Sequence, residues 1–252
     1  PGELATALVG DDVELIADNG APSGERVVVI HNPPVVNREL GIRQSSLKAA
    51  RDISAELIRS GIQTIVFAPS RTRVELLLTY LRDSLRNKPG DPERVTGYRG
   101  GYLPNERRAV EKGLGTIKTV VATNALELGI DIGGLGASVV TGYPGSLASL
   151  WQQFGRAGRS REAALSVLVA SSNPLDQFVA THPDFVFEGA VERGLIDPDN
   201  LFVMASHVKC AAFELPFTVG EVFGANTDEL LDILAEDGVV QTARKARCIA
   251  CN

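Results

Sequence analysis

The sequence predicts an α/β fold, in which helices cover both faces of a parallel sheet and a smaller, mostly helical segment follows. Short apolar stretches of the kind that form buried strands alternate with amphipathic helical stretches along residues 26–170. Such alternation is typical of parallel sheets, whose crossover helices lie on both faces. Beyond about residue 172 the alternation ends and helical patterns dominate. We therefore predict two regions of different architecture.

Six stretches are predicted to be the strands of the sheet. Most are short, apolar and rich in β-branched residues, and breaks containing Pro or Gly separate several of them from the next element. The stretch 94–98 is the least apolar and the weakest candidate. The strands are expected at 26–31, 64–68, 94–98, 118–122, 137–141 and 165–170.

Helical periodicity appears between several of these strands. Residues 45–60 place apolar side chains on one face, and Gly61 is the expected stop. The next helix carries five apolar residues at helical spacing from Val74 to Leu85, so we expect this stripe to pack in the core. Residues 104–114 are predicted to form a short charged helix with proline in its first turn.

The region after residue 172 has a different character. It contains two helical stretches, 201–215 and 228–235, followed by the β-prone residues 238–240. This order is consistent with part of a winged-helix module, and we expect Cys210 to be buried in the first of the two helices. The expected organisation is a lead-in from a preceding domain at 1–24, the α/β domain at 25–172 and the accessory segment at 173–252.

Composition places the chain among ordinary globular proteins, with 44% hydrophobic and 22% charged residues in a length of 252. No apolar run approaches the roughly 18–20 residues that a membrane span requires, and no signal peptide opens the chain. Three cysteines do not make a disulfide framework. We expect a soluble, cytoplasmic protein without a membrane partner.

The net charge of −6 averages over unlike segments. Residues 71–119 contain 11 Lys or Arg against 6 Asp or Glu, a net of +5, whereas 176–238 contain 2 against 13, a net of −11. A local basic zone matters more to a phosphate backbone than the total does. Solvated helix faces of either sign are the ordinary alternative.

Polar and basic residues follow three of the predicted strands directly. The loops at the carboxyl ends of parallel strands hold the ligand site of such sheets. Hydroxyls, arginines and backbone N–H groups beside glycine hold phosphates without reading sequence. Taken singly, each of these residues could also be an ordinary turn or surface residue. They are Ser70, Arg71, Arg99, Gly100, Thr123 and Asn124.

The stretch from Trp151 to Arg159 is the most informative segment of the chain. Gln152 begins a Q-x-x-G-R-x-G-R pattern, which places Arg156 and Arg159 three residues apart, each after a glycine. Guanidinium groups stay charged and can stabilise charge that develops on a transferring phosphoryl group. The pattern suits a surface that closes over the phosphates of a nucleotide held by another domain. An ordinary basic helix turn is the alternative.

Four ordered segments together resemble the second RecA-like domain of superfamily 2 helicases. They are 64–71, 98–108, 121–132 and 152–159, which look like motif IV, the conserved block after it, motif V and motif VI. The residue sequence of motif V and the turn Tyr143-Pro144-Gly145 make the resemblance more specific. They resemble DEAD/DEAH-box DNA helicases of the mitomycin repair factor A type, which are relatives of the RecQ-like Hrq helicases of fungi. The resemblance covers nearly the whole chain and implies a RecA-like sheet at 25–172.

The resemblance also implies roles for single residues. Arg156 and Arg159 would be arginine fingers that reach the γ-phosphate of ATP, and Gln152 would help to position them. Gly129 and Asp131 of motif V would line the nucleotide. The six loop residues named above would contact the backbone of single-stranded or forked DNA.

The sequence contains no P-loop and no D-E-x-[D/H] tetrapeptide. In the helicases that it resembles, both belong to a first RecA-like domain, which holds most of the ATP and its Mg²⁺. We therefore expect half of a motor, whose partner is the first RecA-like domain of the same parent protein and which has no ATP turnover alone. The start at Pro1 and the end just after a Cys-x-x-Cys pair fit a segment of something longer.

The expected function is that of the C-terminal motor half of an ATP-dependent DNA helicase. The resemblance implies 3′-to-5′ movement and a role in DNA repair. An RNA helicase fragment and a non-catalytic nucleic-acid-binding platform are the alternatives that the residues leave open. Cys248 and Cys251 have the spacing of half a structural zinc site, and we expect no metal within this chain.

Overall fold

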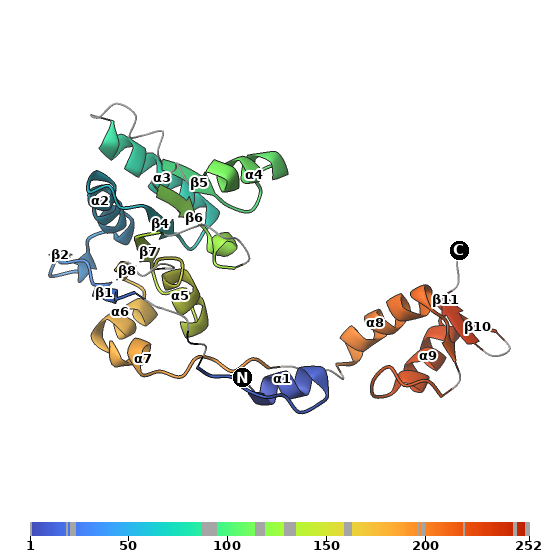
Figure 1. Ribbon diagram of the computed structural model, residues 1–252. Helices are drawn as coiled ribbons and strands as arrows, with labels where there is room; N and C mark the ends of the chain where they lie inside the picture. The colour runs from blue at the N-terminus through green and yellow to red at the C-terminus, as the bar shows by residue number, and fades with distance from the viewer. Residues whose placement is uncertain are drawn as a thin grey trace. The chain divides into compact units, whose positions relative to one another are not determined.

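The computed structural model divides the chain into two compact units, Gly20–Glu192 and a second unit that combines Pro1–Asn19 with Arg193–Asn252. Figure 1 shows the elements of both units. The structure describes residues 2–18, 20, 24–86, 95–113, 119–128, 135–158, 163–195, 197, 200–218, 220–243 and 246–249.

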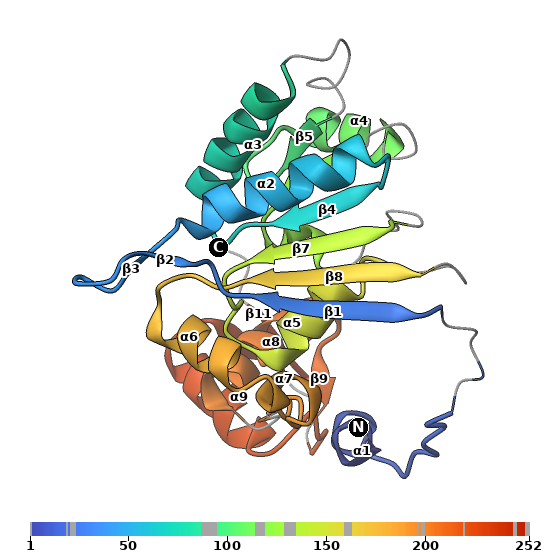
Figure 2. The ribbon, with the colours of Figure 1, turned by 90° about the vertical axis from the view of Figure 1, so that its left-hand side faces the viewer.

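The larger unit contains a six-stranded parallel sheet with the order β1-β8-β7-β4-β6-β5. Figure 2 shows β1, β8, β7 and β4 side by side. All six strands lie where the sequence predicts them, which confirms the α/β fold class. Their bounds are β1 Arg26–His31, β4 Thr64–Phe67, β5 Val95–Tyr98, β6 Thr119–Ala122, β7 Ala137–Thr141 and β8 Ala164–Val169. The hairpin of β2 (Val35–Asn37) and β3 (Ile42–Arg43) was not predicted.

Helices pack on both faces of the sheet because successive strand residues point to opposite sides. In β4, Val66 joins one core cluster with α2 (Ser46–Arg59) and α3 (Arg71–Leu85), including the whole predicted stripe of α3. Its neighbours Ile65 and Phe67 join the cluster of the opposite face, with α5 (Leu147–Phe154). The unit also contains α4 (Pro104–Gly113) and the 3-10 turn η2 (Asn124–Leu126).

Two further helices belong to the α/β unit rather than to the accessory segment. Val179 of α6 (Pro174–Thr181) and Val186 of α7 (Asp184–Phe187) are buried in the same cluster as α5. The compact unit therefore runs to Glu192, beyond the expected boundary at residue 172. The apolar residues of α6 and α7 pack against this cluster through tertiary contacts, which local sequence patterns do not reveal.

The smaller unit has the helix, strand, helix and hairpin of a winged-helix fold. Its strands β9, β10 and β11 form a three-stranded sheet with the order β10-β11-β9. Met204, Val208 and Ala212 of α8 pack with α9 in its core. The elements are α1 (Gly2–Val9), α8 (Leu201–Glu214), β9 (Phe217–Thr218), α9 (Thr227–Glu236), β10 (Val240–Ala243) and β11 (Ala246–Ile249).

One expectation for this unit is wrong, because Cys210 is exposed. The buried stripe of α8 consists of Met204, Val208 and Ala212, at a spacing of four. Cys210 lies two residues from Val208, which is about 200° around the helix, so it faces solvent. The side chain of Cys248 and all of Cys251 lie outside the described residues.

Within the described part of the chain, no helix is long and apolar enough to cross a membrane. Nor does any group of three or more His, Cys, Asp or Glu side chains in that part have an arrangement that could hold a metal ion.

Candidate nucleotide and nucleic-acid site

The loops at the carboxyl edge of the sheet bring the predicted backbone-contacting residues to neighbouring strands. Arg99 follows β5 and Thr123 follows β6, and these strands pair in register, Tyr98 with Ala122. The Thr123 N–H donates to the carbonyl of Tyr98 at 3.4 Å. The next strand, β4, pairs with β6 and leads to Ser70 and the start of α3. Three predicted loops therefore lie next to one another.

Two arginines from different loops converge on one glycine turn. A Cβ atom placed on Gly101 would lie 3.3 Å from Nη1 of Arg99 and 3.7 Å from Nη1 of Arg71. A Cβ atom on Gly100 would lie 3.4 Å from Nη2 of Arg71. Gly101 also has φ +103°, which favours glycine. The bare turn therefore lets both guanidinium groups approach the same backbone, and we call Arg71, Arg99, Gly100 and Gly101 the arginine clamp.

Arg99 is held in the arginine clamp by residues that the sequence analysis did not single out. Its Nε donates to Oε1 of Glu75 at 2.7 Å, and its guanidinium carbon lies 4.8 Å from the ring centroid of Tyr102. The Tyr102 hydroxyl donates to the same Glu75 oxygen at 3.3 Å. The hydrogen bond to Glu75 raises the pKa of Arg99 further, so the guanidinium stays charged. Glu75 lies four residues after Arg71 on α3, a helical spacing that could have signalled its position.

Thr123 caps the 3-10 turn η2. Its side-chain oxygen accepts a hydrogen bond from the N–H of Ala125 at 3.4 Å. This bond uses the hydroxyl as an acceptor and leaves its proton available to donate. The next residue, Asn124, is exposed. The turn therefore presents a hydroxyl and an amide beside the arginine clamp.

Glu127 joins this turn to the helix of the Q-x-x-G-R-x-G-R pattern. Its Oε2 accepts from the hydroxyl of Ser149 at 2.7 Å and from Nε2 of Gln153 at 3.0 Å. Gln153 also donates to the Ser149 hydroxyl at 3.1 Å. We call Glu127, Ser149, Gln153 and Arg156 the motif V–VI link. The first three of these residues were not predicted, because partners 22 and 26 residues apart carry no local signal.

Arg156 is buried, and the main chain of Glu127 holds its guanidinium. Nε of Arg156 donates to the Glu127 carbonyl at 3.0 Å, and Nη2 donates to the same oxygen.

Gln152 lies on α5 with its side chain exposed, whereas Gln153 is only 4% exposed. Gly129, Asp131 and Arg159 lie outside the described residues. The roles predicted for these residues stay predictions.

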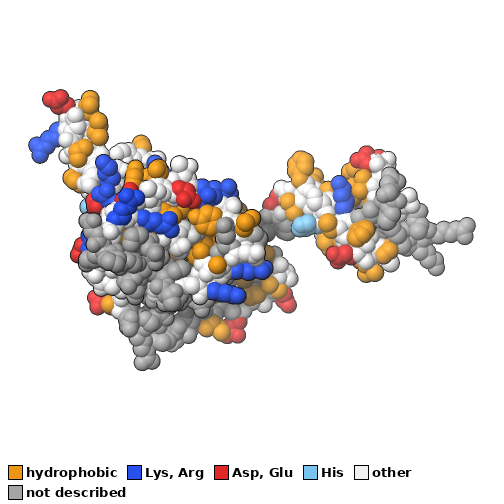
Figure 3. Space-filling view, turned by 90° about the horizontal axis from the view of Figure 1, so that it is seen from above, with side chains coloured by type: hydrophobic (Ala, Val, Ile, Leu, Met, Phe, Trp, Pro, Cys, Tyr) orange, Lys and Arg blue, Asp and Glu red, His pale blue; other side chains and the backbone are white. Residues whose placement is uncertain are grey.

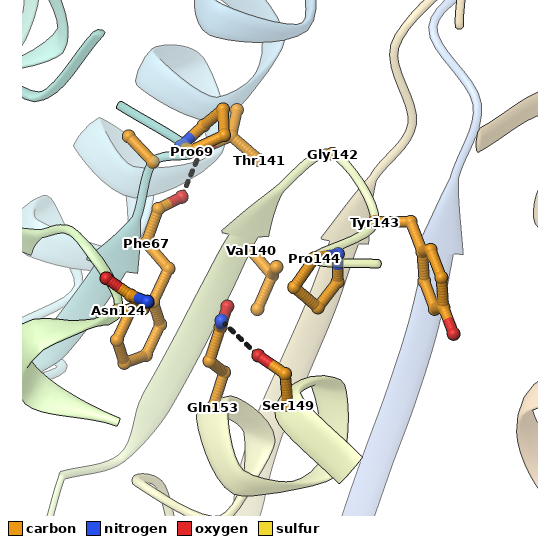
Figure 4. A pocket seen from close by; sticks show the side chains of 11 residues that line it. Phe67, Pro69, Asn124, Val140, Thr141, Gly142, Tyr143, Pro144, Ser149 and Gln153 are labelled. Atoms are coloured by element: carbon orange, nitrogen blue, oxygen red, sulfur yellow. Dashed lines mark hydrogen bonds between the residues drawn. The ribbon is translucent and has the colours of Figure 1, made fainter. Parts of the chain in front are cut away.

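A small pocket of about 180 Å³ opens between motif V and α5 (Figure 4). Phe67, Val140 and Pro144 give it apolar walls, and Asn124 lies at its side. The Gln153 amide nitrogen faces Ser149, which turns the amide oxygen the other way (Figure 4). That oxygen is buried and has no hydrogen-bond partner among the described residues.

The start of α5 is fully capped. The Ser146 hydroxyl accepts from the N–H of Ser149 at 3.1 Å. The Glu192 carboxylate accepts from the N–H groups of Leu147 at 2.7 Å and Ala148 at 3.0 Å. These bonds satisfy amide donors that have no partner inside the helix and place a negative charge at its positive end.

The cap makes a pH-dependent contribution to stability. The bonds from Ala148 and then Leu147 lower the pKa of Glu192. A depressed carboxylate pKa stabilises the fold above the unfolded pKa, and this contribution is lost as pH falls through the folded pKa. We expect Glu192→Gln to lower Tm at pH 7 and to have a smaller effect at about pH 3, where the pH has fallen below the usual carboxylate range towards the lowered folded pKa. Thermal unfolding across pH, with Glu188→Gln as control, measures this; an equal effect at both pH values would contradict it.

A parallel sheet with these loops, followed by a winged-helix unit, is the architecture of the C-terminal helicase domain of superfamily 2 helicases. Residues 48–161 match the helicase conserved C-terminal domain family. Residues 196–245 match the winged helix domain of the ATP-dependent helicase HRQ1 family. The two matches follow one another in the order in which the structure places the α/β sheet and the winged-helix elements.

The particular relatives are helicases of the Hrq and MrfA type, to which the chain is homologous. It is 47% identical over 243 residues to the uncharacterized ATP-dependent helicase YprA of Bacillus subtilis, covering 95% of this chain and 32% of YprA. It is 38% identical over 215 residues to HRQ1 of Saccharomyces cerevisiae, covering 82% and 20%. A crystal structure of the DUF1998 helicase MrfA bound to DNA and AMPPNP is 45% identical with TM-score 0.90, covering all of this chain and 35% of that one. The chain thus spans about a third or less of these relatives.

Proposed function

We propose that the chain is the second motor half of an ATP-dependent DNA helicase and that its carboxyl edge grips single-stranded or forked DNA. The observation that carries this proposal is the arginine clamp beside the exposed turn of Thr123 and Asn124. Arginine forks, hydroxyls and exposed backbone N–H groups are the groups that hold a phosphate backbone. The contact is independent of base sequence, as a translocating motor requires.

ATP and Mg²⁺ would lie mainly on a first RecA-like domain of the same parent protein. Arg156 and Arg159 would reach the γ-phosphate across the cleft, helped by Gln152, while Gly129 and Asp131 would line the nucleotide. The motif V–VI link supports this division, since it connects the loop at the nucleic-acid edge to the helix before Arg156. Hydrolysis would then change the grip of that edge on the strand. The DNA repair role and the cytoplasmic location are part of the same proposal.

DNA is favoured over RNA as the strand because the similar MrfA structures hold DNA. Nothing in the arginine clamp distinguishes deoxyribose from ribose, since a phosphate contact does not read the sugar. Competition between DNA and RNA oligonucleotides of the same sequence, at constant salt, tests this choice. Tighter binding of the RNA oligonucleotide would support the RNA helicase alternative.

The arginine clamp predicts a specific loss of DNA affinity. We expect Arg71→Gln and Arg99→Gln each to weaken single-stranded DNA binding by about tenfold, because each removes a charge-assisted bond to phosphate. Each change should also reduce the slope of log K against log salt by about 0.7. Fluorescence anisotropy at several salt concentrations measures both quantities.

Two control variants make this test specific. Arg86→Gln removes the same charge from the far end of α3, where Arg86 pairs with Asp83 at 2.8 Å, and should leave binding nearly unchanged. Glu75→Gln keeps both arginines but loosens Arg99, so it should give an intermediate loss. If Arg71→Gln and Arg99→Gln bind like the unmodified chain, the proposed DNA grip is wrong.

A further inference from the structure

A hollow lined by two arginines lies at the same edge of the α/β unit, next to the arginine clamp. It has a volume of about 680 Å³ and lies between the starts of α2, α3 and α6. Two arginines, Arg43 and Arg73, line it, and none of the residues that line it is Asp or Glu. Figure 3 shows Lys and Arg side chains at several places on the visible face of this unit, with Asp and Glu side chains among them. We call this region the helix-start hollow.

The start of α2 has amide donors that its own cap leaves unsatisfied. Ser70 caps α3 by accepting from Arg73 N–H at 3.3 Å, and Asn173 caps α6 in the same way at 2.9 Å. Ser45 precedes α2, but its side chain makes no such bond. The first N–H groups of a helix carry partial positive charge and have no partner within the helix. An anion in the hollow would satisfy them.

Two side chains in the hollow are without partners. Ser46 is only 7% exposed and lines the hollow, yet no described residue forms a hydrogen bond with its hydroxyl. The Ser46 hydroxyl is not one of the fully buried unpaired atoms, so it is open to the hollow and its proton is available to a ligand there. The guanidinium of Arg73 likewise has neither an ion pair nor a hydrogen bond within the described part of the chain, and its side chain is exposed. Both groups can donate to an oxyanion.

The chemistry of the hollow favours phosphate over a base. No aromatic ring lines it, so no platform exists on which a base would stack. Its donors are guanidinium, hydroxyl and amide groups, which together suit a phosphodiester oxygen. Ser70 lines the hollow, and the next residue, Arg71, belongs to the arginine clamp. Adjacent Cα atoms are about 3.8 Å apart, so one strand can reach both sites.

We propose that the helix-start hollow binds a further phosphate of the same DNA strand and so lengthens the grip beyond the arginine clamp. This inference rests on the proposed function, because it places the strand at the same edge. Arg73, the hydroxyl of Ser46 and the free amides of α2 hold that phosphate. Arg43 adds charge from the side while one of its nitrogens donates to the Pro33 carbonyl at 2.9 Å.

The test measures binding of an oligonucleotide of about 20 nucleotides, which is longer than the roughly 4–16 that a single binding fold covers. Arg73→Gln should weaken binding about fivefold and lower the salt slope by about 0.7, since one phosphate contact is lost. Ser46→Ala should weaken it about twofold. Arg86→Gln serves as the matched control on the same helix, and thermal unfolding confirms that each variant folds.

Oligonucleotides that carry one uncharged methylphosphonate locate the contact. At one position of the strand, the methylphosphonate should weaken DNA binding by the unmodified chain but not by the Arg73→Gln variant. This position should differ from those at which the Arg71→Gln variant is insensitive to the methylphosphonate. If Arg73→Gln and Ser46→Ala bind with normal affinity and salt slope while Arg71→Gln is weakened, the hollow inference is wrong and the proposed function stands. If Arg71→Gln is also normal, both fail. Calorimetry with inorganic phosphate tests whether the ligand of the hollow is free phosphate rather than DNA. If free phosphate binds in an Arg73-dependent way while Arg73→Gln leaves DNA affinity unchanged, the inference is also overturned.

Discussion

Replacing Arg156 or Arg159 with alanine is expected to lower ATP turnover by about 10³-fold or more in a helicase that joins this domain to a first RecA-like domain. An arginine finger neutralises charge that develops on the transferring phosphoryl group, and no other side chain supplies the same planar fork. DNA binding should change little, because the arginine clamp lies on different loops. DNA-stimulated phosphate release and fluorescence anisotropy measure the two effects.

Arg156 needs a separate control, because its guanidinium also holds the Glu127 carbonyl. A purely structural Arg156 would lower Tm and turnover together, whereas a finger would lose turnover at a nearly unchanged Tm when replaced by lysine. Arg51→Ala, which removes a surface arginine paired with Asp52 at 2.7 Å, should affect neither quantity. Turnover that survives both Arg156→Ala and Arg159→Ala would rule out the finger assignment.

The fold was predictable from the sequence because its signals are local. Short β-branched stretches and the stripe from Val74 to Leu85 depend on spacing alone. The structure buries the stripe and the strands other than β1, in which Val27 and Val29 are exposed. The shared edge of the loops was predictable too, since parallel strands end on the same side. The packing of α6 and α7 against the sheet was not, because it depends on tertiary contacts of Val179 and Val186.

The finer geometry of the site was less predictable. The motif pattern singles out Gln152, but the buried and hydrogen-bonded glutamine is its neighbour Gln153. One residue is about 100° around a helix, so only the packing of α5 decides which glutamine faces inward. The helix-start hollow likewise brings together segments near residues 43–47, 70–76 and 171–173, which no short motif spans.

Glu127→Ala is expected to uncouple DNA binding from ATP turnover. The carboxylate is the acceptor for both Ser149 and Gln153, so its removal breaks the side-chain part of the link between the turn of Thr123 and Asn124 and α5. The bond from Arg156 to the main-chain carbonyl of residue 127 is kept. We expect the stimulation of turnover by DNA to fall by about tenfold, which corresponds to a coupling energy of about 1.4 kcal/mol, while affinity for single-stranded DNA changes little. Turnover measured with and without saturating DNA gives the stimulation directly.

Loss of the Glu127 carboxylate also leaves the buried Gln153 amide short of an acceptor, at a cost of about 1–3 kcal/mol in unfolding free energy. Removing both partners relieves that cost, so the double variant Glu127→Ala with Gln153→Leu should regain Tm. It should not regain stimulation by DNA, because the side-chain connection from residue 127 to α5 is still missing. Glu56→Ala, at an exposed position of α2, controls for the lost charge. Recovery of stimulation together with Tm would mean that Glu127 only stabilises the fold, whereas recovery of Tm alone identifies it as a positioning residue between the two loops.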